Sequence, residues 1–62
     1  MTIAEKILLY RAKNNLSQRE FAELCGTYQP YISEIETGAR IPGKMLELKI
    51  NLLCDKEEQE NG

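Results

Sequence analysis

Apolar side chains recur at the three- and four-residue spacing of a helix in the first part of the chain, between clear start and stop signals. Thr2 and Glu5 form a capping box, in which each side chain bonds an otherwise unpaired backbone N–H at a helix start. Ile7 and its apolar neighbours follow at helical spacing. This pattern predicts a helix that runs to about Asn14, where Asn15 can adopt the left-handed conformation that ends a helix.

A second helix is predicted directly afterwards. Ser17 and Glu20 repeat the capping box, and an apolar face that includes Phe21 follows. Gly26 comes after about two turns and tolerates the positive φ that a sharp stop requires. We therefore expect a short helix that ends at this glycine.

The pattern predicts a third helix after this stop. Thr27 is the expected N-cap, and Pro30 falls in the first turn, where its missing N–H costs nothing. Ile32 and Ile35 are expected to face the core, and Gly38 to close the helix. Two short helices joined by a tight turn with one glycine form a helix-turn-helix unit.

Residues 44–54 carry two conflicting signals. Their apolar residues alternate almost strictly from Leu46 to Leu52, as in a strand, yet most of the segment consists of strong helix formers. We favour a helix, with one face for the core and a second apolar stripe beside it. The core face would hold Leu46, Ile50 and Leu53, and the stripe Met45, Leu48 and Leu52. As a strand, the segment would instead pair with its copy in a second subunit.

The length and charge of the chain set its organisation. Sixty-two residues allow one domain. The net charge is −2, but residues 55–62 hold four acids and one lysine, so residues 1–54 sum to +1. We therefore expect a domain over residues 1–54 and an acidic, disordered tail over residues 55–62.

Several classes of function are disfavoured by composition. The chain has no histidine, and Cys25 and Cys54 lie far apart, so no zinc-ligand spacing exists and both are expected to be reduced thiols. No phosphate-binding loop and no nucleophile–base set is present, which argues against an enzyme. We expect no metal and no cofactor. Without an apolar run long enough to span a bilayer and without a signal peptide, a cytoplasmic location is expected.

The chain resembles a known family from Arg11 to Pro42, and more loosely to Leu53. It shares the pattern Leu-Ser-Gln-x-Glu-x-Ala-x-x-x-Gly-x-x-Gln-x-x-Ile-Ser-x-x-Glu-x-Gly-x-x-x-Pro with the helix-turn-helix domains of phage repressors and Cro-like proteins, the XRE type. The resemblance implies an all-α, lambda-repressor-like bundle of four to five helices. It also implies sequence-specific binding of double-stranded DNA, with the third helix in the major groove.

Carried over to this sequence, the resemblance assigns DNA-contacting residues. Gln18 is expected to bind a phosphate, and the start of the third helix to read bases. The base-reading set is Tyr28, Gln29, Tyr31, Ser33 and Glu34. Gln29 can pair with adenine, Glu34 can accept from a cytosine amino group, and a tyrosine ring can pack on a thymine methyl. Pro30 stands where similar proteins often carry a polar base-reading side chain.

Four basic residues are further candidates for phosphate contacts: Arg19, Arg40, Lys13 and Lys44. Each is equally well explained as a solubilising surface charge. Only Arg40 is favoured by the resemblance. Similar domains also pair an arginine and a glutamate beneath the surface, so Arg11 and Glu36 are expected to form a structural ion pair.

These expectations combine into a transcriptional regulator, most simply a phage or mobile-element repressor that acts by occupying its operator. The apolar stripe suggests a homodimer on a palindromic site, and the short chain suggests no small-molecule effector. The acidic balance leaves an alternative, a protein-interaction module of the same fold such as an antitoxin or antirepressor partner. The chain is also compatible with a fragment of a longer repressor.

Overall fold

The chain folds into helices only. The computed structural model describes the backbone of residues 1–60 and the side chains of residues 1–55. Its elements are α1 (Ile3–Asn14), α2 (Gln18–Cys25), α3 (Gln29–Thr37) and α4 (Lys44–Glu60). No strand occurs within this part, so the all-α prediction is confirmed and the strand alternative for residues 44–54 is wrong.

Both predicted capping boxes are present. The backbone N–H of Thr2 donates to Glu5 Oε1 at 2.9 Å, and the N–H of Glu5 donates to Thr2 Oγ1 at 3.1 Å. The Thr2 N–H bonds the carboxylate, and this bond, followed by the interaction of the carboxylate with the Thr2 side chain, lowers the pKa of Glu5 from its ordinary value. Ser17 and Glu20 form the same pair of bonds at the start of α2. Local side-chain chemistry therefore fixes where the first two helices begin.

The prediction that Thr27 caps α3 is wrong. Tyr28 is the N-cap, and its side chain makes no capping bond. The N–H of Thr27 donates to the carbonyl of Ala22 at 2.9 Å, as part of the turn that closes α2 at Gly26, where φ is 73°. Because Thr27 completes the end of one helix, the carbonyl of the next residue begins the other, and it accepts from the N–H groups of Tyr31 and Ile32.

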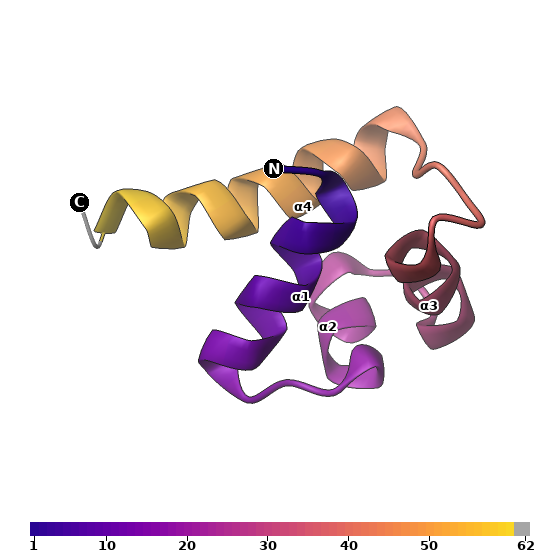
Figure 1. The fold of residues 1–62 in the computed structure, drawn as a ribbon, viewed down its shortest axis with the longest axis horizontal. Coiled ribbons are helices and arrows are strands. Elements are labelled where there is room, and N and C mark those ends of the chain that lie inside the picture. Colours follow the sequence, from indigo (N-terminus) through magenta and orange to yellow (C-terminus); the bar gives the residue numbers. More distant parts are fainter. Residues whose placement is uncertain (61–62) are drawn as a thin grey trace.

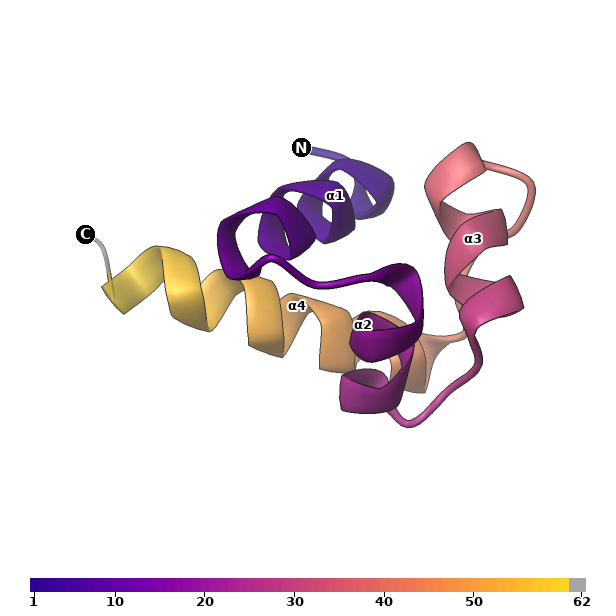
Figure 2. The same cartoon turned by 90° about the horizontal axis from the view of Figure 1, so that it is seen from below.

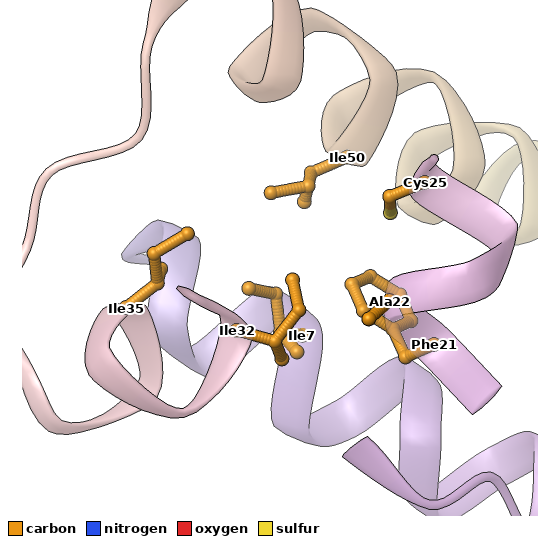
Figure 3. Close-up of a cluster of buried hydrophobic side chains, with 7 residues drawn as sticks. All are labelled: Ile7, Phe21, Ala22, Cys25, Ile32, Ile35 and Ile50. Carbon is orange, nitrogen blue, oxygen red and sulfur yellow. The ribbon is translucent and has the colours of Figure 1, made fainter. Parts of the chain in front are cut away.

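The four helices surround one small core. In Figure 1, α4 runs across the top of the molecule and contacts α1, which descends from it. Both views place α3 at the side of the molecule away from the end of α4, and it packs against α2 and α1 (Figures 1 and 2). Buried apolar side chains from all four helices meet in the middle (Figure 3). They are Ile7, Phe21, Ala22, Cys25, Ile32, Ile35 and Ile50. The ring of Tyr10 packs edge-on against Phe21, with centroids 5.7 Å apart. The core thus holds α3 by two isoleucines and leaves its opposite side free.

Helix α4 continues past the predicted domain boundary. Its backbone remains helical to Glu60, and its last turns project beyond the other three helices in both views (Figures 1 and 2). Lys6 of α1 bonds Asn51 at 2.9 Å and Asp55 at 3.1 Å. Asp55, expected to start the tail, therefore contacts Lys6 of α1, and the boundary at residue 54 stays a prediction. For residues 61–62, which lie outside the described residues, the tail stays a prediction.

The two free cysteines are expected to differ in reactivity. Cys25 is 4% exposed in the core, and this burial raises the pKa of its thiol, although nearby Lys49 acts in the opposite direction. A thiol-specific reagent at about pH 8 should therefore modify half-buried Cys54 first and Cys25 only when the domain opens. Labelling followed by mass spectrometry checks this, with the urea-unfolded chain as control. Equal rates for both cysteines in the native domain would contradict it.

Candidate nucleic-acid interface

The N-terminal end of α3 exposes two residues of the predicted base-reading set, Tyr28 and Gln29. Tyr28 is 78% exposed, and Gln29 and Pro30 follow it on the surface. Ile32 and Ile35 anchor the opposite side of the helix in the core. In Figure 2 this helix stands at the edge of the molecule, so its outer face is open to a partner.

Arg11 and Glu36 join α1 to the end of α3. Arg11 Nη1 donates to both carboxylate oxygens of Glu36, at 3.0 and 2.8 Å, and Arg11 Nε donates to the carbonyl of Leu16 at 3.1 Å. The side chain of Glu36 is only 7% exposed and that of Arg11 22%. The structure thus contains the expected ion pair in a largely desolvated position.

This ion pair continues into a chain of hydrogen bonds that reaches the surface. Gln18 Nε2 donates to Glu36 Oε1 at 2.8 Å, and Gln29 Nε2 donates to Gln18 Oε1 at 2.7 Å. A carboxylate can only accept, so Glu36 requires the Gln18 amide to turn its NH₂ inward and its oxygen outward. That oxygen in turn accepts from the NH₂ group of Gln29. The orientation of an exposed amide is therefore set by a buried charge.

The chain of bonds leaves a defined hydrogen-bonding pair on Gln29. One N–H of its Nε2 is used by Gln18, and within the described residues neither the second N–H nor Oε1 has a partner. A free donor beside a free acceptor matches the major-groove edge of adenine, whose N7 accepts and whose N6 donates.

A second group of side chains lies one turn further along α3. Arg40 Nε donates to Glu34 Oε1 in a close ion pair, and the guanidinium lies 5.3 Å from the centroid of the Tyr31 ring. The bond to Glu34, and then its charge, raise the pKa of Arg40. The hydroxyl of Tyr31 accepts from the N–H of Gly43 at 3.1 Å. These contacts fold the loop after α3 back onto the helix.

The turn at the end of α3 explains this arrangement. Gly38 has φ 84°, and the N–H groups of Ala39 and Arg40 both donate to the carbonyl of Glu34, at 2.9 and 3.3 Å. The chain therefore reverses over the last turn of α3 and brings Arg40 back to Glu34.

Comparison with known proteins assigns the family. A family model described as helix-turn-helix matches residues 7–51, which is most of the chain. The match covers the last two thirds of α1, all of α2 and α3, and the first half of α4. The chain belongs to the XRE-type helix-turn-helix family. No curated protein and no solved structure matches it. No described helix of this domain has the length and apolar character needed to cross a membrane.

Membership identifies a DNA-binding domain of the kind that regulates transcription, and α2 and α3 form its helix-turn-helix. The two carboxylates of α3 are the main electrostatic obstacle to DNA. Each has its own arginine, since Glu34 pairs with Arg40 and Glu36 with Arg11. The whole chain has a net charge of −2, but the outer face of α3 does not carry unpaired negative charge within the described residues.

The helix-turn-helix domain does not bring all the predicted DNA-contacting residues together. Arg19 is 82% exposed on α2 and lies 3.8 Å from Glu23, and Lys44 is exposed at the start of α4. Lys13 lines a hollow between α1 and α4, together with Cys54 and Asp55, away from α3. Ser33 is half-buried. The phosphate contacts of these basic residues remain predictions.

Two features of the interface have no counterpart in the sequence prediction. The bond between Gln18 and Gln29 links residues assigned separately to phosphate and base. Pro30, predicted in the first turn of the third helix and noted as a departure from the family pattern, also lines a shallow hollow with Tyr28, Tyr31, Glu34 and Arg40. Helix caps and residue spacing do not predict these two features, because both features depend on how α2, α3 and the following loop pack.

Proposed function

We propose that this domain is a sequence-specific transcriptional repressor of the phage or mobile-element kind, which acts by occupying an operator with α3 in the major groove. The observation that carries the proposal is the oriented amide of Gln29, held through Gln18 by the Arg11–Glu36 pair. Fixing an exposed glutamine costs side-chain entropy in the free protein. A base-reading residue benefits from this, because its donor and acceptor already have the geometry needed for binding and less entropy is lost on binding DNA.

Phosphate contacts would position this helix. Gln18 keeps a second N–H on Nε2 that no described residue uses, and it lies beside Gln29 at the start of the helix-turn-helix. A hydrogen bond from this group to a backbone phosphate would fix the distance of α3 from the bases. Arg40, Arg19 and Lys44 would add charge around the groove.

The apolar stripe on α4 supports a homodimer. Met45, Leu48 and Leu52 are 79%, 54% and 61% exposed, and Leu52 lies one turn beyond Leu48 on the same side of the helix. Packing two such stripes would bury them and present two copies of α3 to half-sites of a palindrome about one helical turn apart. We expect a dimeric mass by sedimentation at high micromolar concentration, and a monomer with and without DNA would exclude this arrangement.

Selection of randomised duplex DNA tests the function directly. The purified domain is incubated with the library at about 50 and about 200 mM salt, and the bound fraction is sequenced. We expect an enriched inverted repeat whose half-site contains an adenine. No enrichment at either salt would reject the repressor and favour the protein-interaction alternative, in which the α4 stripe binds another protein.

Gln29→Ala gives the matching residue-level prediction. Loss of a bidentate contact should weaken binding to the selected operator by about 1–3 kcal/mol and remove discrimination at one adenine. The control is an operator with that A·T pair replaced. Wild-type protein should bind the altered operator less tightly, whereas the variant should bind both equally. A variant that keeps the preference would show that Gln29 does not read this base.

A further inference from the structure

The hollow on the outer face of α3 combines an acceptor with an apolar wall. Tyr28, Pro30, Tyr31, Glu34 and Arg40 line it, and it is shallow and wide open. Pro30 and Glu34 are four residues apart and therefore neighbours on one side of the helix. A planar group that enters from outside meets the carboxylate and the apolar proline and tyrosine rings together.

The carboxylate of Glu34 is held in place and keeps one oxygen free. Arg40 occupies Oε1, and no donor within the described residues contacts Oε2. Arg40 is itself fixed, because its guanidinium lies over the Tyr31 ring and the Tyr31 hydroxyl accepts from Gly43. The charge of Glu34 is thus compensated by a partner that does not block its second oxygen. Such an acceptor can approach DNA without an uncompensated negative charge.

The chemistry of the hollow selects one base. An acceptor in the major groove requires an exocyclic amino group, which cytosine offers at N4 and adenine at N6. Adenine places its acceptor N7 beside that group, whereas cytosine places its apolar C5–H there, which suits an apolar wall, and thymine presents an oxygen in place of the amino group. The C5 position of cytosine adjoins N4 on the same edge of the base. In the hollow, the apolar ring of Pro30 lies beside the carboxylate of Glu34. A methyl group at C5 would be buried there rather than excluded.

We infer that this hollow reads a cytosine, with Glu34 accepting from N4 and the wall of Pro30 and Tyr28 accommodating a C5 methyl group, so that the domain binds 5-methylcytosine at this position at least as tightly as cytosine. The inference rests on the proposed function, since it requires α3 in the major groove. It adds a second base to the adenine assigned to Gln29, and a tolerance for DNA modification.

The test uses the operator obtained by selection, with each cytosine in turn replaced by 5-methylcytosine or thymine. At one position, methylation should raise affinity up to about fourfold, as expected for burial of one methyl group. Thymine at the same position keeps the methyl but loses the amino group, and should weaken binding about 5- to 150-fold. Two variants then separate the two parts of the hollow.

Glu34→Gln should abolish most of the preference for cytosine over thymine, because an amide can donate to the thymine oxygen. Pro30→Ala keeps the carboxylate, so it should retain that preference and lose the gain from methylation. Both positions are on the surface, and circular dichroism checks that both variants fold. Two results would overturn the inference but not the proposed repressor function. In one, methylation of each cytosine in the selected operator weakens binding. In the other, Glu34→Gln keeps the preference for cytosine over thymine. Failure to select any duplex would overturn both.

Discussion

Arg11→Ala is expected to lower the free energy of unfolding by about 3–5 kcal/mol. The substitution leaves the Glu36 carboxylate, 7% exposed, without its main counter-charge, and also removes the bond to the Leu16 carbonyl. A domain of this size has a total stability of roughly 3–9 kcal/mol. The loss therefore removes about a third of the stability or more, and the variant should melt well below the wild-type temperature.

Arg19→Ala is the matched control for this prediction. It also removes an arginine from an ion pair with a glutamate, but both side chains are well exposed and 3.8 Å apart. A pair of this kind contributes about 0–1 kcal/mol, so the control should melt near the wild-type temperature. Thermal and urea unfolding followed by circular dichroism measure both variants. An unchanged melting temperature for Arg11→Ala would show that the pair does not support the fold.

Phe21→Ala should have a comparable effect for a different reason. Phe21 is completely buried, contacts the Tyr10 ring and fills the centre of the core, so its truncation should cost about 3–5 kcal/mol. Unlike the Arg11 variant, it removes no charge, and its effect should persist unchanged in high salt. Urea unfolding at low and high salt measures both properties.

Leu24→Ala provides the comparison within the same helix. Leu24 is 51% exposed, so its truncation removes less buried surface and creates no internal cavity. We expect a loss well below that of Phe21→Ala. Equal losses for the two variants would mean that Leu24 is covered in solution by a partner or a second copy.

The sequence predicted the helices well because their ends depend on nearby residues. Thr2 with Glu5, and Ser17 with Glu20, bond to backbone groups three positions away, and Asn15, Gly26 and Gly38 stop helices through their own positive φ. The N-cap prediction for Thr27 was wrong because the end of α2 and the start of α3 share one short turn. Which residue caps α3 depends on how many residues the end of α2 uses, and the sequence pattern does not give that number.

The sequence predicted which residues form the candidate site but not which of them bond to one another. Gln18, Gln29, Glu34 and Arg40 were all expected at the surface, each with a separate role. Their pairing follows from the crossing of α2 and α3 and from the reversal at Gly38, which bring together residues that are 11 and 6 positions apart. Helix periodicity does not encode such contacts, so the pairing of Glu34 with Arg40 could not be predicted from the sequence.

The bonds from Arg11 to Gln29 place a limit on how this domain can acquire new targets. If the oxygen and NH₂ group of Gln29 exchanged places, its bond to Gln18 would be kept only if the Gln18 amide rotated as well. Glu36 has no donor to bond the rotated Gln18 amide. Changes there would be tied to losses of stability. Tyr28 and Pro30 contribute nothing to the core, so under the proposed function changes in specificity should accumulate at those two positions while the adenine proposed for Gln29 stays constant.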